Sequence, residues 1–345
     1  MNDDLICFVG DLHFGEKGNS EKYNNSLLTL CGFIVEESKS RGCSKLFQFG
    51  DWHHDRLKIN VDTLNKSVEG AKIFSEYFTE AYTIVSNHDI FYRDRLDVSS
   101  MKILEPYITV IDKPTKLFDD KVIAVPWVVD GQMWDDVVEM SKSCEYMFAH
   151  LELNGFNVND AYVMEHGHSH VALKHLKKVY TGHYHSPQVK DNIVYCGTPI
   201  PITMNEANEK HGIYFFNLKT GDCEFVEYNG VTVVSIPYDK LDEVLATCDP
   251  SNSYIRVEFP EDLEDELLIS AAQDKLQAAN VSEFKIQYVP IAVREILNSD
   301  VEDVSDVENI DGVVMQFIDS ANSLAAVDND LLKEIYKLAI ERSHD

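Results

Sequence analysis

Short apolar runs recur along the first two-thirds of the chain, and a polar cluster containing Asp, Asn or His follows each one at once. A buried strand that leads into a loop produces this pattern. Amphipathic stretches at 27–38 and 64–78 predict helices between some of the runs. Strands that alternate with helices favour a layered α/β sheet, whose ligand-binding loops gather at the carboxyl ends of the strands. The predicted strands are 5–9, 46–49, 82–85, 146–148 and 179–181.

A second region begins near residue 231, where the pattern predicts a small α/β domain with strands at 231–236, 254–259 and 284–289 and a helix at 262–279. Between Glu295 and Asp311 there are seven acidic residues and no basic one, which favours a solvated linker over DNA mimicry or a docking motif for a basic protein. Amphipathic stretches at 313–323 and 329–341 predict two helices too short to be stable alone. Their position after the linker favours an external partner over packing on their own domain. The predicted units are 1–230, 231–292, 293–312 and 313–345.

Charge sets a limit on the function, because the formal net charge is -29 and a chain that binds DNA by itself usually has a basic surface. Bound cations or a basic partner would lessen this objection. The acidic N-terminus and the lack of an apolar run of about eighteen residues predict no signal peptide and no membrane span, so we expect a cytoplasmic protein. Seven scattered cysteines without a CxxC pair indicate neither a zinc ribbon nor a disulfide framework.

The polar clusters carry carboxylate, amide and imidazole groups, which suit divalent ions such as manganese, iron or zinc. In an extended segment, residues two apart point to the same side, so Asp-x-His and His-x-His can each reach one centre. A carboxylate shared by two ions is typical of two-metal hydrolases. The clusters are Gly10-Asp11-Leu12-His13, Gly50-Asp51, Ser86-Asn87-His88-Asp89, Ala149-His150 and Gly182-His183-Tyr184-His185.

In this order the five clusters resemble the calcineurin-like metallophosphoesterases. The resemblance implies a four-layer α/β/β/α domain, followed here by the small α/β capping domain and the helix pair. It also implies two divalent ions, with Mn²⁺ the expected metal. The first ion would be held by Asp11, His13, Asp51 and His185, and the second by Asp51, Asn87, His150 and His183. Asp51 would bridge them.

His88 resembles the histidine that stabilises the transition state or protonates the leaving oxygen in this superfamily. His54, three residues after the bridging Asp51, matches a position where relatives place a polar residue near the scissile phosphate. Ser86 is a departure, because relatives usually have glycine before Asn-His. We therefore expect His88 and His54 to be catalytic, and we expect Ser86 to alter the turn more than the metal site.

Three wider segments make the chain similar to SbcD-like nuclease subunits, above all those of T-even-like bacteriophages: Gly-Asp-Trp-His-His-Asp at 50–55, Ala-His-Leu-Glu-Leu-Asn-Gly at 149–155 and Tyr-Cys-Gly-Thr-Pro at 195–199. The match covers residues 5–230 well and the last third only by layout. It implies exonuclease activity on duplex ends and endonuclease activity on single strands or hairpins, in recombination and double-strand break repair. The implied partners are DNA, a second nuclease subunit and an SbcC-type coiled-coil ATPase bound by the terminal helices.

Several alternatives stay open at this point. Gly167-His168-Ser169-His170 repeats the pattern of residues 182–185, but it lies in a polar loop, so we interpret His166, His168 and His170 as a surface loop that could approach substrate. Trp52, Trp127 and Trp134 are expected in the core or at its rim rather than as platforms for DNA bases. The same ligand set would also serve a phosphoesterase for phosphoproteins or small nucleotides, and the fold could persist in a non-catalytic scaffold.

Overall fold

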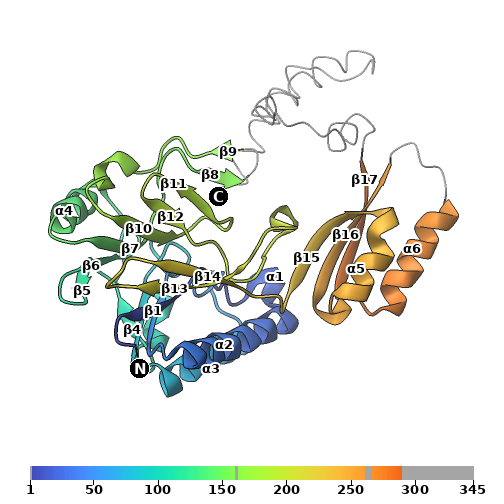
Figure 1. Cartoon of the computed structure of the whole chain (residues 1–345), viewed down its shortest axis with the longest axis horizontal. Coiled ribbons are helices and arrows are strands. Elements are labelled where there is room, and N and C mark those ends of the chain that lie inside the picture. Colours follow the sequence, from blue (N-terminus) through green and yellow to red (C-terminus); the bar gives the residue numbers. More distant parts are fainter. Residues whose placement is uncertain (1, 160–161, 261–265, 290–345) are drawn as a thin grey trace, which may run out of the picture.

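The computed structural model describes residues 2–159, 162–260 and 266–289 (Figure 1). The predicted acidic linker at 293–312 and helix pair at 313–345 lie outside these residues. Within them, no helix is both long enough and apolar enough to cross a membrane.

In the first sheet, the N-terminal strand β1 lies between β13 and β2. This sheet has six strands in the order β14-β13-β1-β2-β3-β4, in which β1 to β4 are parallel and β13 and β14 are added antiparallel. The predicted strands at 5–9, 46–49 and 82–85 correspond to β1, β2 and β3. The bounds are β1 Leu5–Val9, β2 Lys45–Gln48, β3 Glu80–Ile84, β4 Thr109–Ile111, β13 Gly212–Asn217 and β14 Cys223–Glu227.

The second sheet also has six strands, in the order β11-β12-β10-β7-β6-β5. Its four inner strands are parallel and its two edge strands are antiparallel. The predicted strands at 146–148 and 179–181 correspond to β7 and β10. The bounds are β5 Thr115–Leu117, β6 Val122–Val125, β7 Tyr146–His150, β10 Lys178–Gly182, β11 Gln188–Lys190 and β12 Ile193–Tyr195, and a short pair, β8 Asn157–Asn159 and β9 Tyr162–Val163, lies beyond β7.

The two sheets pack face to face, and the alternation of side chains along β1 shows how. Ile6 and Phe8 point into an aromatic core between the sheets, while Cys7 and Val9 point the other way, into the core beneath the helices. Phe8 contacts Phe148 of the second sheet with 4.7 Å between ring centroids. Both faces of β1 are therefore buried, which explains its continuous apolar sequence.

Helices cover the outer face of each sheet and complete four layers. On the first sheet, α2 (Glu21–Arg41) and α3 (Val61–Tyr77) lie side by side (Figure 1), and α1 (Glu16–Asn19) precedes them. On the second, α4 (Gly131–Ser141) packs through Val137. Ser20 caps α2 and Asn60 caps α3 through side-chain oxygens that accept backbone N–H groups. The predicted α/β metallophosphoesterase fold class is confirmed.

A third sheet, set to one side in Figure 1, has a core of its own. Its strands β15 (Thr232–Pro237), β16 (Ser253–Pro260) and β17 (Glu283–Val289) are parallel and correspond to the predicted strands at 231–236, 254–259 and 284–289. Helices α5 (Leu241–Thr247) and α6 (Glu266–Ala278) pack on it. The sequence pattern predicted α6 but not the short α5.

Candidate metal centre

The loops that follow β1 and β2 are tied together by their backbones. The amides of Leu12 and His13 both donate to the carbonyl oxygen of Asp51, at 3.0 and 2.8 Å. His13 and Asp51 have φ angles of 53° and 48°, and His183 has a φ of 100°. Left-handed backbone is costly for residues with a side chain and persists where the surroundings enforce it. Three predicted metal ligands are thus held in strained conformations at the carboxyl ends of their strands.

Asp51 lies between two histidines that come from different sheets. Its Oδ2 atom is 3.4 Å from His13 Nε2, and its Oδ1 atom is 3.5 Å from His150 Nε2. Ligand atoms of Asp11, Asp51 and His150 lie within 4.8 Å of one another, and so do those of Asp11, His13 and His185. Each oxygen of Asp51 therefore faces a different group of predicted ligands, as a bridging carboxylate requires.

Ser86 contributes directly to the position of Asp51. Its buried hydroxyl accepts a hydrogen bond from the Asp51 amide at 2.7 Å and donates to Asp89 Oδ2 at 2.6 Å. Asp89 Oδ1 in turn accepts from the His53 amide at 3.1 Å. A glycine at this position could make none of these side-chain contacts. The serine therefore links the turn before Asn87 to the loop after β2.

Glycine is required where the second sheet approaches the first. A Cβ atom on Gly182 would lie 2.3 Å from Asp11 Oδ1 and 3.0 Å from His150 Nδ1. The next residue, His183, donates its amide to Asp11 Oδ2 at 2.9 Å. The close approach at Gly182 is therefore what brings the His183-x-His185 segment to the carboxylates of the first sheet.

The structure places the two Gly-His-x-His segments differently. The rings of His183 and His150 are 5.3 Å apart, and those of His185 and His13 are 5.0 Å apart, so the later segment lies among the predicted ligands. His168 of the earlier segment instead stacks on Trp134, with 4.4 Å between centroids. Trp52 is fully buried in the core, as predicted.

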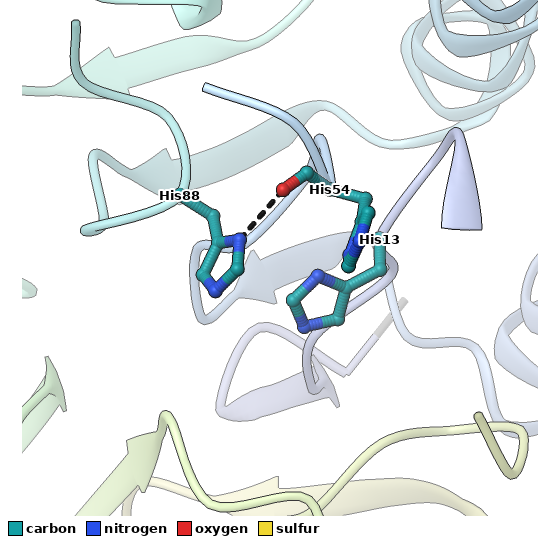
Figure 2. Close-up of side chains that lie close together, drawn as sticks. All are labelled: His13, His54 and His88. Carbon is teal, nitrogen blue, oxygen red and sulfur yellow. Dashed lines mark hydrogen bonds between the residues drawn. The ribbon is translucent and has the colours of Figure 1, made fainter. Parts of the chain in front are cut away.

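His88, His54 and His13 converge from three loops (Figure 2), and their ring nitrogens lie within 4.8 Å of one another. His88 Nδ1 donates to the backbone oxygen of His54 at 2.6 Å, which leaves Nε2 as the nitrogen available to a ligand. His54 Nδ1 lies 2.5 Å from Glu16 Oε2. The two predicted catalytic histidines thus lie together at the edge of the predicted ligands, and Glu16 orients one of them.

The burial and charge of the site fit divalent cations. Burial lowers the pKa of His13 well below its usual range and that of His150 to about 4, so both rings are neutral and can offer a lone pair. Burial and the nearby charge of Asp51 raise the pKa of Asp11. Burial would also raise the pKa of Asp51, but His150, His88 and His13 outweigh it and lower that pKa.

Several buried polar atoms at this point have no hydrogen-bond partner among the described residues. They are Asp11 Oδ1, His13 Nδ1 and Nε2, Asn87 Oδ1 and His150 Nε2. An unsatisfied buried polar atom costs roughly 1–3 kcal/mol, so a cluster of them calls for a ligand. Divalent ions would satisfy the lone pairs and balance the carboxylates.

Two carboxylates that sequence reasoning did not single out orient predicted ligands. Glu152 Oε2 is 3.4 Å from His183 Nε2, and Glu206 Oε1 is 3.7 Å from His185 Nδ1. Glu206 is buried and closes a capping box with Thr203, a Thr-x-x-Glu pattern that is visible in the sequence. Nothing in the sequence marked Glu16, whose partner His54 is far away along the chain.

Glu206→Ala is expected to lower the stability of the metal-free protein by roughly 3 kcal/mol at neutral pH. Burial would raise the pKa of Glu206, but His185 and the donors on Ile202 and Thr203 outweigh it and lower the pKa from 4.5 to about 2. A lowered carboxyl pKa gives stability that is present above pH 4.5 and lost as pH falls toward 2. Denaturant unfolding of the wild type and of Glu206→Ala at several pH values measures this loss of stability.

Glu224→Ala, at an exposed residue of β14, is the matched control and should change stability by less than about 1 kcal/mol. Equal losses in the two variants, or a loss for Glu206→Ala that does not shrink below pH 4.5, would contradict this account of Glu206.

Two facing sheets flanked by helices, with Asp, Asn and His side chains gathered at the carboxyl ends of their strands, define the chain as an α/β protein of the metallophosphoesterase fold. It is similar to exonuclease subunit 1 of Enterobacteria phage T4, with 27% identity over 326 residues, which is 87% of this chain and 94% of the relative. The resemblance to SbcD-like phage nuclease subunits is thereby confirmed. No protein-family model matches the chain.

Proposed function

We propose that this chain is the nuclease subunit of a DNA-processing complex and hydrolyses phosphodiester bonds with two bound divalent ions. The observation that carries the proposal is the position of Asp51, whose two oxygens face His13 and His150 from opposite sheets. The similarity to a phage exonuclease subunit over most of both chains supports DNA as the substrate. The proposed activities are exonuclease action on duplex ends and endonuclease action on single strands and hairpins.

In this proposal one ion is held by Asp11, His13, Asp51 and His185, and the other by Asp51, Asn87, His150 and His183. Nitrogen and oxygen ligands without cysteine suit manganese, iron or zinc, and we propose Mn²⁺ because the family resemblance implies it. When bound, the ions supply Lewis-acid activation of water and balance the charge that develops on the phosphate.

The chain's own side chains complete the chemistry. The hydrogen bond from His88 Nδ1 to the His54 oxygen fixes the ring and presents Nε2 toward the substrate, where a protonated imidazole can stabilise a phosphate oxygen or protonate the leaving oxygen. His54 lies next to it, with 5.6 Å between the ring centroids, and is held by Glu16. We propose that His54 contacts the phosphate and that His88 is the acid.

The charge of the chain supports a role within an assembly. With a net charge of -29, the isolated chain would bind DNA weakly and with strong dependence on salt. We propose that an SbcC-type coiled-coil ATPase supplies basic surface, that residues 313–345 bind it, and that 231–292 faces the DNA. The proposal includes a homodimer of nuclease subunits, which light scattering of the full chain tests.

Digestion of end-labelled linear duplex DNA by the full chain with Mn²⁺ tests the activity. Shortening of the labelled strand by the wild type, and its loss in Asp51→Asn and His88→Ala, is the expected result. Intact DNA even in the presence of the ATPase, together with cleavage of bis-p-nitrophenyl phosphate, would instead favour a phosphoesterase for phosphoproteins or small nucleotides. Loss of both activities despite bound metal would favour a scaffold.

A double substitution in the last predicted helix, Ile335→Asp with Leu338→Asp, is expected to weaken binding to the ATPase by roughly tenfold or more, because it places charge on the apolar stripe. Lys333→Asp with Lys337→Asp adds the same side chains off the stripe and serves as the control. Binding is measured by titration calorimetry. Equal affinities for the two variants would contradict the assignment of this helix to the partner.

A further inference from the structure

A cavity of about 160 Å³ lies beside the candidate metal centre. None of the proposed metal ligands lines it, and neither do His88 and His54. Trp127 lines the cavity and also lies next to that centre, with ring-centroid distances of 5.1 Å to His183 and 6.0 Å to His150. The lining residues are Trp127, Val128, Leu151, Glu152, His166, Gly167 and His168.

The loop that contains His166, Gly167 and His168 forms one wall of this cavity, and backbone hydrogen bonds hold it in place. The His168 amide donates to the Glu152 oxygen at 2.9 Å, and the Asn154 amide donates to the His168 oxygen at 3.0 Å. A Cβ atom on Gly167 would lie 2.7 Å from the Glu152 oxygen, so this contact requires glycine. The second Gly-His-x-His segment is thereby fixed against the end of β7.

Two ring-bearing residues of the lining, Trp127 and His168, are also held in place. The Trp127 amide donates to the Val85 oxygen at 2.8 Å, which ties this residue to the strand end that leads to Asn87. Trp134 stacks on His168 at an interplanar angle of 15° and holds that ring in place. Both residues are therefore positioned before any ligand arrives, which lowers the entropic cost of binding.

The lining chemistry suits a planar group. Trp127, His166 and His168 offer rings, Val128 and Leu151 offer apolar surface, and no Lys or Arg is among the lining residues. The one acidic side chain, Glu152, would repel a phosphate, whereas cations at the proposed ligands would attract it. A nucleotide bound with its phosphate at the metals would thus leave its base, not its phosphate, for this cavity.

We propose, on the basis of the nuclease function above, that this cavity receives one unpaired base of the DNA next to the scissile phosphate. Aromatic rings bind bases of any sequence by stacking, which suits a nuclease that must cut without a recognition site. Holding one base out of the duplex stack also separates the terminal pair and presents the phosphate to the metals. Trp127, expected at the rim of the core, would thus serve the substrate.

Cleavage of single-stranded oligonucleotides by the full chain with Mn²⁺ tests the inference. One substrate is intact, and two others carry a single abasic residue on the 5′ or the 3′ side of one cleavage position. The wild type is expected to cut one of the abasic substrates with a kcat/KM roughly five- to hundredfold below that of the intact one. Trp127→Ala should cut the intact substrate and that abasic substrate equally slowly. Trp127→Phe should restore part of the difference in kcat/KM between these two substrates.

Tyr77→Ala removes a half-buried aromatic side chain at the C-terminal end of α3 and should keep the full difference between the intact and the abasic substrate. Photo-cross-linking of an oligonucleotide with 5-iodouracil at the affected position, without metal, gives a readout independent of cleavage and should label the peptide that contains Trp127. Equal cleavage of all three substrates by the wild type, or a difference that survives in Trp127→Ala, would overturn the inference and leave the nuclease function standing. No cleavage of any substrate would overturn both.

Discussion

Asp51→Asn should abolish cleavage of DNA, with a fall in kcat/KM of at least roughly a thousandfold, and should reduce bound Mn²⁺ to fewer than two ions per chain. The amide keeps the size of the side chain and one acceptor atom but removes the negative charge between His13 and His150, from which the carboxylate oxygens lie 3.4 and 3.5 Å away. Calorimetric titration with Mn²⁺ measures the stoichiometry, and the end-labelled digest measures the activity.

Asp55→Asn makes the same chemical change four residues later, at a side chain that accepts a hydrogen bond from the Leu57 amide, and is the matched control. It should keep both ions and most of the activity. A variant at Asp51 that still binds two ions, or still degrades DNA near the wild-type rate, would show that Asp11 bridges the ions instead, because Asp11 belongs to both groups of ligand atoms.

His88→Ala should lower kcat for DNA by roughly a hundred- to ten-thousandfold while the bound Mn²⁺ stays at two ions per chain. Its Nδ1 atom is committed to the His54 oxygen and its Nε2 atom is free for substrate, so no ligand of the proposed ions is lost. His175→Ala, at an exposed histidine whose ring nitrogens contact Ser141 Oγ and the Ala172 oxygen rather than a predicted ligand, should change neither quantity.

A substrate with a good leaving group separates the two roles of His88. Thymidine 5′-p-nitrophenyl phosphate releases a phenolate that needs little protonation, so the loss in His88→Ala should shrink on this substrate if the histidine is the acid. An equal loss on both substrates would assign it to the phosphate oxygens. A fall in metal content would instead identify His13, His54 and His88 as a further ion-binding group.

The strands and the order of the polar clusters could be predicted because their signals are local. In β1, the run Leu5–Val9 is apolar on both faces, and the next residues leave the sheet at its carboxyl end with Asp11 and His13. The same logic located β2, β3, β7 and β10. Because parallel strands bring such ends together, the clusters could be expected to lie near one another, and the family resemblance supplied the assignment of the individual ligands.

Other features depend on contacts between distant segments and left no local signal. Gly167-His168-Ser169-His170 has the same Gly-His-x-His pattern as the predicted ligand segment, but its backbone pairs with Glu152 and Asn154 instead of approaching Asp11. Ser86 was expected to alter the turn more than the metal site, and its hydroxyl also accepts a hydrogen bond from the Asp51 amide. Glu16 and Glu152 act on histidines whose proximity only the folded chain reveals.

The candidate centre is divided between two sheets, and this division affects when the centre can form during synthesis of the chain. Asp11, His13, Asp51 and Asn87 come from the first half of the chain, whereas His183 and His185 follow β10, and β1 obtains its second neighbour only when β13 has been added. During synthesis the centre therefore stays incomplete until more than half of the chain has left the ribosome. A fragment released before β10 is complete would lack His183 and His185, two of the proposed ligands.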